Sequence, residues 1–90
     1  MKLFGRVDAN HREIVKALRD AGCSVKSLGS VGGGCPDLLV GRLGKNYLLE
    51  CKSGPKGKFT TDQQAFQVIW RGQWARVNNS IEALEVVGVL

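Results

Sequence analysis

The chain has 90 residues, of which 43% are hydrophobic and 23% are charged, a composition that is typical of a soluble globular protein and excludes a disordered tail. Its length predicts a single domain over residues 1–90, because no second core fits. Thirteen Lys and Arg residues against eight Asp and Glu residues give a net charge of +5, which favours a polyanionic partner.

The first half of the chain predicts one helix and three strands. Ile14, Val15, Leu18 and Ala21 recur at helical spacing and predict a helix from Asp8 or Asn10 to Ala21, with either residue as its N-cap and Gly22 as its stop. Short strands are then expected over 23–28, 37–41 and 47–52, with a glycine-rich loop after the first and a turn containing Gly44 after the second.

The second half predicts a helix, a strand and a last helix. Thr60 or Thr61 is expected to cap the first of these helices, whose apolar stripe, Trp70 included, is expected to pack in the core. A strand is expected over 74–77, and Ser80 is expected to cap a helix that runs to about Glu85. The element order α-β-β-β-α-β-α predicts a small α/β domain with helices on a mixed β-sheet.

Two acidic residues lie inside a basic stretch of the sequence. Between Ala21 and Thr61 the only acids are Asp37 and Glu50, and they are surrounded by Lys26, Arg42, Lys45, Lys52, Lys56 and Lys58. A surface that only binds phosphates gains nothing from carboxylates, since each repels the ligand. A metal site that acts on phosphates needs them.

A hairpin of the expected length would bring Asp37, at the start of the second strand, to Glu50, Cys51 and Lys52 at the end of the third. Asp37 and Glu50 can then converge on a hard cation such as Mg²⁺ or Mn²⁺, to which the Cys51 backbone carbonyl could add an oxygen. Lys52 would hold or deprotonate the attacking water, or offset charge that develops on the phosphate. The sequence therefore predicts phosphodiester hydrolysis.

Gly34-Cys35-Pro36-Asp37 followed by Glu50-Cys51-Lys52 resembles the PD-(D/E)xK nuclease superfamily. The segments 31–41, 48–52 and 59–63 are similar to the VRR-NUC (virus-type replication-repair nuclease) family, especially its stand-alone members from phages and prophages. The resemblance covers about Val7 to Leu84. Thr61 stands where the family often has proline and Cys51 where it often has valine, and neither position supplies a metal-ligand side chain.

The resemblance implies a restriction-endonuclease-like core and a metal-dependent endodeoxyribonuclease with Asp37, Glu50 and Lys52 as catalytic residues. Gln63, with Gln64 as its competitor, matches a glutamine that the family carries near the metal and substrate. Glu13 falls where the superfamily often has an acidic metal ligand, and the sequence leaves open whether it faces the site or solvent. The family is also associated with homodimers that cut branched DNA, such as Holliday junctions, in DNA repair.

Several other residues have a structural and a functional interpretation. Lys45, Lys56 and Lys58 are either solubilising or phosphate contacts beside the site, and we expect the second. Gly33 and Gly34 are interpreted as a flexible approach that lets backbone come close to DNA, because the glycine run lacks the nucleotide-binding pattern that would suggest a small-molecule cofactor. His11 is interpreted as a surface or cap residue.

The remaining expectations concern the environment and the rival functions. Cys23, Cys35 and Cys51 are expected to be reduced thiols, neither a disulfide framework nor a zinc site. No apolar run reaches the ~18 residues of a membrane span, and the polar start does not resemble a signal peptide, so we expect no membrane partner and a location in the cytoplasm of a bacterial or phage-infected cell. The rivals are a non-catalytic basic DNA-binding module and a small subunit of a larger DNA-processing complex that docks through residues 86–90.

Overall fold

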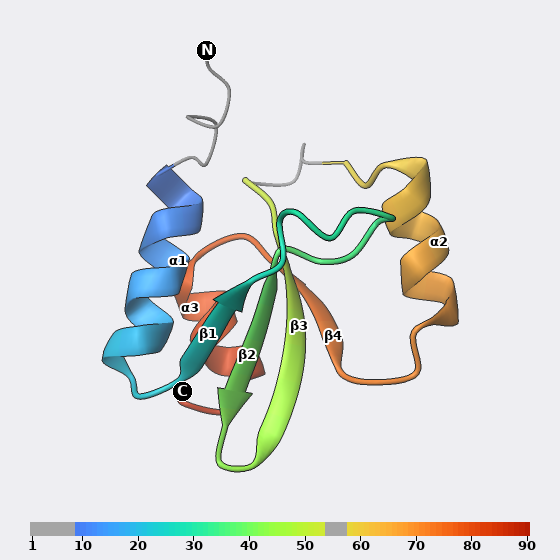
Figure 1. Cartoon of the computed structure of the whole chain (residues 1–90). Coiled ribbons are helices and arrows are strands. Elements are labelled where there is room, and N and C mark those ends of the chain that lie inside the picture. The colour runs from blue at the N-terminus through green and yellow to red at the C-terminus, as the bar shows by residue number, and fades with distance from the viewer. Residues whose placement is uncertain (1–8, 54–57) are drawn as a thin grey trace.

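The structure, a computed structural model, describes residues 9–53 and 58–90. These residues form three helices and a four-stranded mixed sheet, which confirms the predicted α/β fold and is consistent with a restriction-endonuclease-like core (Figure 1). In chain order the elements are α1 (Ala9–Asp20), β1 (Ser24–Ser27), β2 (Leu38–Arg42), β3 (Lys45–Cys51), α2 (Thr61–Ile69), β4 (Trp74–Val77) and α3 (Ser80–Val86).

The strands lie in the sheet in sequence order, β1-β2-β3-β4. β1 pairs with β2 and β2 with β3 in antiparallel fashion, whereas β4 runs parallel to β3. A parallel neighbour needs a crossover connection, and the segment that contains α2 supplies it. Because β3 and β4 are parallel, their carboxyl ends lie at the same edge of the sheet, close to where β2 begins.

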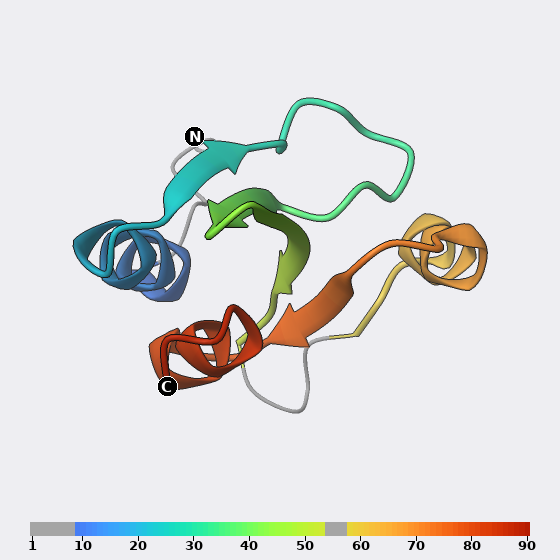
Figure 2. The same ribbon diagram turned by 90° about the horizontal axis from the view of Figure 1, so that it is seen from below.

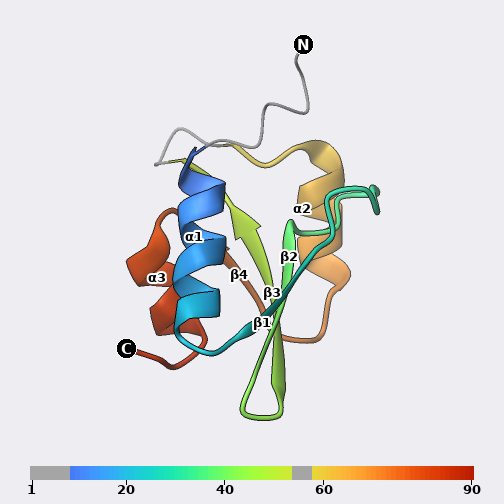
Figure 3. The ribbon, with the colours of Figure 1, turned by 60° about the vertical axis from the view of Figure 1, so that its left-hand side comes forward.

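The core lies between one face of the sheet and the helices α1 and α3 (Figures 2 and 3). Alternate strand residues point into it, as the period of two in β-strands requires. Its buried members come from both helices, from the segments that follow them and from three strands: Ile14, Leu18, Cys23, Leu38, Val40, Leu49, Val77, Ala83 and Val87. The last of these and the half-buried Val89 show that part of the apolar tail packs on the core, while Leu90 stays exposed.

The helix ends confirm some of the predicted signals and correct others. Gly22, with φ of 91°, ends α1 in a Schellman motif, in which Gly22 N–H donates to Arg19 O and Cys23 N–H to Leu18 O. The predicted cap Asn10 is wrong, because α1 already begins at Ala9, and Asp8 lies outside the described residues. Asn79 and not Ser80 caps α3, since its side chain accepts the Glu82 N–H.

The expectation that the apolar stripe of α2 packs in the core is wrong. No residue of α2 is buried, and Trp70 at its end is 44% exposed. α2 stands on the side of the sheet away from α1 and α3, so its apolar stripe cannot join the core that lies between those two helices and the sheet (Figure 2). Phe66 and Trp70 instead stack on each other, with ring centroids 5.2 Å apart.

None of the helices in the described residues is both long and apolar enough to cross a membrane.

Candidate functional site

The β2–β3 hairpin brings the two isolated acids together. Leu43 and Gly44 form its two-residue turn with positive φ values of 51° and 80°, the conformation that matches the twist of the flanking strands. The resulting register pairs Leu38 with Leu49, so that Asp37 lies next to the end of β3. There its Oδ2 accepts the Cys51 backbone N–H at 2.8 Å.

Glu50 is the buried charged residue of this cluster. It is 2% exposed, on the sheet face opposite the main core. The pKa of Glu50 is raised from 4.5 to about 7, first by burial away from water and then by the charge of Asp37 and a hydrogen bond between the two carboxyl groups, while Lys52 opposes the shift. Two carboxyl groups are therefore held together where burial disfavours a second negative charge.

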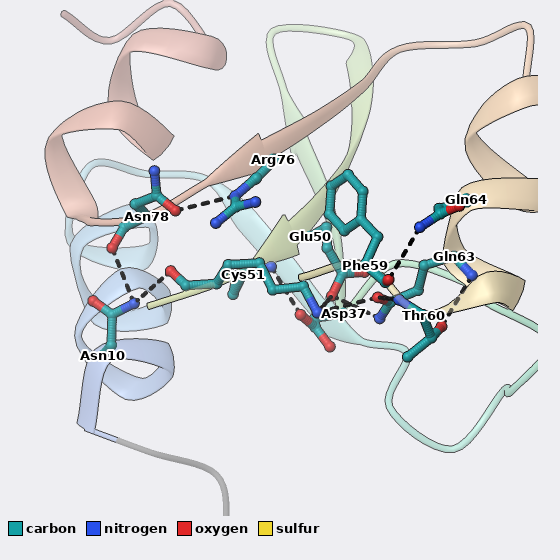
Figure 4. Close-up of polar contacts among 11 residues, drawn as sticks. Asn10, Asp37, Glu50, Cys51, Phe59, Thr60, Gln63, Gln64, Arg76 and Asn78 are labelled. Carbon is teal, nitrogen blue, oxygen red and sulfur yellow. Dashed lines mark hydrogen bonds and ion pairs between the residues drawn. The ribbon is translucent and has the colours of Figure 1, made fainter. Parts of the chain in front are cut away.

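Gln63 joins the start of α2 to this acid pair. Its Nε2 donates to Glu50 Oε2 at 3.1 Å, and its Oε1 accepts from Lys52 Nζ at 3.1 Å and from the Thr60 N–H at 2.9 Å (Figure 4). Thr60 completes a capping box by accepting the Gln63 N–H at 3.1 Å. The cap that begins α2 thus also orients the amide that faces the acids, whereas Gln64 is exposed and donates to the Phe59 carbonyl.

Lys52 lies in a largely protein environment. Its Nζ is 3.6 Å from Glu50 Oε2, and its side chain is only 16% exposed. Lys52 Nζ lies over the Phe59 ring, 5.7 Å from its centroid, and the guanidinium carbon of Arg76 lies over the same ring at 5.5 Å. The Phe59 and Trp74 rings meet edge to face, with their centroids 5.6 Å apart. These contacts hold the positive charge of Lys52 in place next to Glu50.

Arg76 is a basic residue that sequence reasoning missed. β4 pairs it directly with Glu50, so both side chains lie on the same face of the sheet. The available signal was the alternation within β4, in which Trp74 and Arg76 alternate with Ala75 and Val77. Only the parallel pairing of β4 with β3 shows that Arg76 lies next to Glu50.

The oxygen atoms at this site suit a hard divalent cation. Asp37 and Glu50 supply carboxylates at one point, and such ions prefer oxygen ligands. Burial and the neighbouring Asp37 carboxyl raise the pKa of Glu50, and a cation between the two carboxylates would offset both effects. The residues at this site therefore fit a hard divalent cation. A contribution from the Cys51 backbone carbonyl stays a prediction.

His11 reaches the site, contrary to its interpretation as a surface or cap residue. One ligand atom each of His11, Asp37 and Cys51 lie within 4.8 Å of one another, and all three residues are half-buried. The thiol of Cys51 alternates away from Glu50, so this group lies on the α1 side of Asp37. No local pattern identifies it, because it depends on how α1 packs against the end of β3.

The other predicted site residues lie at different places. Glu13 is exposed on α1, and a ligand role for it stays a prediction. Lys45 begins β3 at the opposite end of the hairpin from the site, about 20 Å away for six residues of strand, so its expected place beside the site is wrong. Lys58 is exposed on the approach to α2, and Lys56 lies outside the described residues.

The glycine loop contacts protein where contact with DNA was expected. A Cβ on Gly34 would lie 2.1 Å from the Asp62 carbonyl oxygen and 2.8 Å from the Gln63 nitrogen, so Gly34 packs against the first turn of α2. Gly33, with φ of 64°, has open space around it. Gly34 therefore positions α2 and its glutamine, and only Gly33 keeps the geometry expected of a backbone approach to DNA.

Comparison with known proteins identifies a family. The model of a family described as archaeal Holliday junction resolvase matches residues 5–81, which include every element from α1 to β4. No curated protein and no solved structure matched the chain.

Proposed function

The chain belongs to the archaeal Holliday junction resolvase family of the PD-(D/E)xK nuclease superfamily, and on this premise we propose that it is a Mg²⁺- or Mn²⁺-dependent endonuclease that cuts four-way DNA junctions. The observation that carries the proposal is the convergence of Asp37, Glu50, Lys52 and Gln63 at one sheet edge. The likeness to stand-alone phage members of the VRR-NUC family is part of the same proposal.

Asp37 and Glu50 would hold the cation, which supplies Lewis acidity toward the phosphate and a water of lowered pKa. Asp37 is oriented for this by the Cys51 N–H, and Glu50 by the Gln63 amide. Lys52, 3.6 Å from Glu50, would hold the attacking water or offset the charge that develops on the phosphate. Asp37, Glu50 and Lys52 lie at or next to strand ends, and Gln63 lies in the first turn of α2.

Gln63 is a positioning residue in this proposal. Its side chain holds both Lys52 Nζ and Glu50 Oε2. We expect Gln63→Ala to slow junction cleavage about 10- to 100-fold, as is usual when a partner of a metal ligand is removed. Gln64→Ala is the matched control, since Gln64 is exposed and its side chain donates to the Phe59 carbonyl rather than to the acid pair. Equal effects of the two substitutions on the cleavage rate in single-turnover assays would contradict a positioning role for Gln63.

The basic excess supports a DNA substrate. Besides Lys52 and Arg76 at the site, Arg12 and Arg19 line a hollow of about 380 Å³ along α1 that begins at His11. Phosphate contacts along such a surface carry affinity without sequence information. We therefore expect binding that weakens steeply with salt.

A homodimer would supply two cutting sites for a symmetric junction. Apolar side chains that the protomer leaves uncovered support this part of the proposal, with Val68 82% and Ile69 70% exposed on α2. Near the end of the same helix, Trp70 and Leu39 border a hollow of about 410 Å³. An exposed apolar surface of this kind supports a protein–protein contact at α2.

A panel of labelled four-way junctions, flaps and linear duplex tests the substrate. We expect cleavage of the junction at rates well above the others, in Mg²⁺ or Mn²⁺. Salt-sensitive binding without turnover in either metal would instead support a DNA-binding module. Preferential cutting of flaps would support the proposed nuclease activity and contradict the four-way junction as its substrate.

A further inference from the structure

The nuclease proposal uses the Asp37 carboxylate and leaves two other ligand groups beside it without a role. The Cys51 thiol and the His11 imidazole lie on the α1 side of Asp37, and the ligand atoms of all three residues fall within 4.8 Å of one another. They come from three segments: the first turn of α1, the end of β3 and the residue before β2. Their meeting is a product of tertiary packing.

The packing that brings His11 there is well defined. Asn10 Nδ2 donates to the Lys52 carbonyl at 3.2 Å and to the Asn78 carbonyl at 3.0 Å, which ties the first turn of α1 to the residues that follow β3 and β4 (Figure 4). His11 is the next residue along the helix, and Cys51 precedes one of the two anchor points. Asp37 is fixed in turn by the Cys51 N–H at 2.8 Å.

The ligand set differs in chemistry from the neighbouring pair of carboxylates. One imidazole nitrogen, one thiolate and one carboxylate are typical of Zn²⁺, whereas Mg²⁺ prefers oxygen alone. Bonds of ~2.0 to 2.3 Å to a tetrahedral ion place ligand atoms about 3.5 Å apart. The three ligand atoms lie within 4.8 Å of one another, so the spacing exceeds this value by at most about 1.3 Å, which small side-chain rotations can close.

We propose that His11, Asp37 and Cys51 form a site for Zn²⁺, with a fourth position left open, and that its occupation inhibits the enzyme. Binding converts the Cys51 thiol to a zinc thiolate and releases one proton to solvent. Inhibition follows because both sites require Asp37, whose carboxylate is then drawn toward the α1 side. This second half rests on the proposed nuclease function, and the first half does not.

Titration of the metal-free protein with Co²⁺, as a coloured probe for the Zn²⁺ site, tests binding. We expect a thiolate-to-cobalt charge-transfer band that saturates at one equivalent and that Zn²⁺ abolishes by displacement. Cys51→Ser should remove the band, and His11→Ala should weaken Co²⁺ binding at least about 10-fold. Thermal melts of the metal-free variants check folding, with Cys51→Ala as the replacement if the serine variant unfolds.

Cys35→Ser is the matched control for the thiol. Burial is the largest cause that raises the pKa of the Cys35 thiol, and the nearby charges of Glu50 and Asp37 also raise it. Cys35 is therefore a second thiol close to the same acids. We expect Cys35→Ser to keep the cobalt band. No band in the wild type, or a band that Cys35→Ser removes and Cys51→Ser keeps, overturns the site.

Cleavage in Mg²⁺ with increasing Zn²⁺ tests the inhibition. Each protein is compared with its own rate in the absence of Zn²⁺, and we expect the concentration for half-inhibition to rise at least about 10-fold in His11→Ala. Equal Zn²⁺ sensitivity of wild type and variant overturns the inhibitory role. If the chain cuts no DNA, the nuclease proposal fails while the cobalt titration still decides the Zn²⁺ site.

Discussion

Glu50 places an unfavourable charge in the folded protein. Its pKa is raised from 4.5 to about 7, chiefly by burial and then by Asp37. The folded state therefore holds a proton that the unfolded state releases at lower pH, so stability falls as pH rises from 4.5 to 7. Above pH 7 the full penalty, on the order of 3 kcal/mol, applies to the protein without a cation.

Glu50→Gln should remove this pH dependence, because the amide keeps the shape of the side chain and carries no charge. We expect the free energy of unfolding in EDTA to fall between pH 5 and pH 8 in the wild type and to change much less in the variant. Urea titrations at several pH values measure it. Glu85→Gln, at an exposed position of α3, is the control and should follow the wild type. Parallel curves for wild type and Glu50→Gln would contradict the account.

The N-terminal turn of α1 depends on Asn10. Its amide bonds to two carbonyls, of Lys52 and Asn78, that are distant in sequence. Asn10→Ala leaves both acceptors without this donor, and we expect a loss of about 1 to 3 kcal/mol in thermal or urea unfolding. Lys16→Ala on the same helix breaks only an exposed pair with Asp20, and should cost less than about 0.5 kcal/mol. Similar losses for both would refute the anchoring role.

At the scale of elements, the position of α2 relative to the sheet depends on Gly34. A methyl group there would overlap the Asp62 carbonyl, so the helix start must move. Gly34→Ala should destabilise the protein by about 2 kcal/mol or more and slow cleavage, since Gln63 moves with the helix. Gly33→Ala pays the positive-φ cost of about 1 to 2 kcal/mol but meets open space. If both variants unfold and cleave alike, the contact has no special role.

Local signals predicted much of the fold. The Gly44 turn between two apolar runs predicted the hairpin and the approach of Asp37 to Glu50, because strand register follows from a two-residue turn. Thr60 was one of the two predicted caps of α2, and the structure confirms it as the N-cap, in a capping box with Gln63. In both cases the information lies within about fifteen residues of chain.

Features that depend on distant packing were not predictable. The exposure of Trp70 and the distance of Lys45 from the site follow from the placement of α2 and the direction of the hairpin. The approach of His11 to Cys51 requires that α1 pack against the ends of β3 and β4, which no periodicity encodes. The sequence interpretation of Gly34 relied on its conformational flexibility. In the structure its small size matters, because the start of α2 leaves no room for a side chain there.

At the scale of the whole molecule, the exposed apolar side of α2 predicts self-association. Ile69→Glu introduces a charge at a side chain that is 70% exposed, so the protomer should fold normally while a dimer that buries this side chain weakens. Gln67→Glu, also exposed on α2, is the control for added charge. Sedimentation should show a dimer for wild type and control and a monomer for Ile69→Glu. A wild-type monomer at all concentrations would reject the homodimer.

The most direct test of the account is cleavage of a labelled four-way junction by wild type and Asp37→Asn, each in Mg²⁺ and in EDTA. Losing a cation ligand removes several kcal/mol of transition-state stabilisation, so the variant should cut at least about 100-fold more slowly. Asp62→Asn, an exposed acid on α2, should cut at the wild-type rate. We predict junction cleavage by the wild type in Mg²⁺ alone, whereas cutting in EDTA or an active Asp37→Asn enzyme would contradict the account.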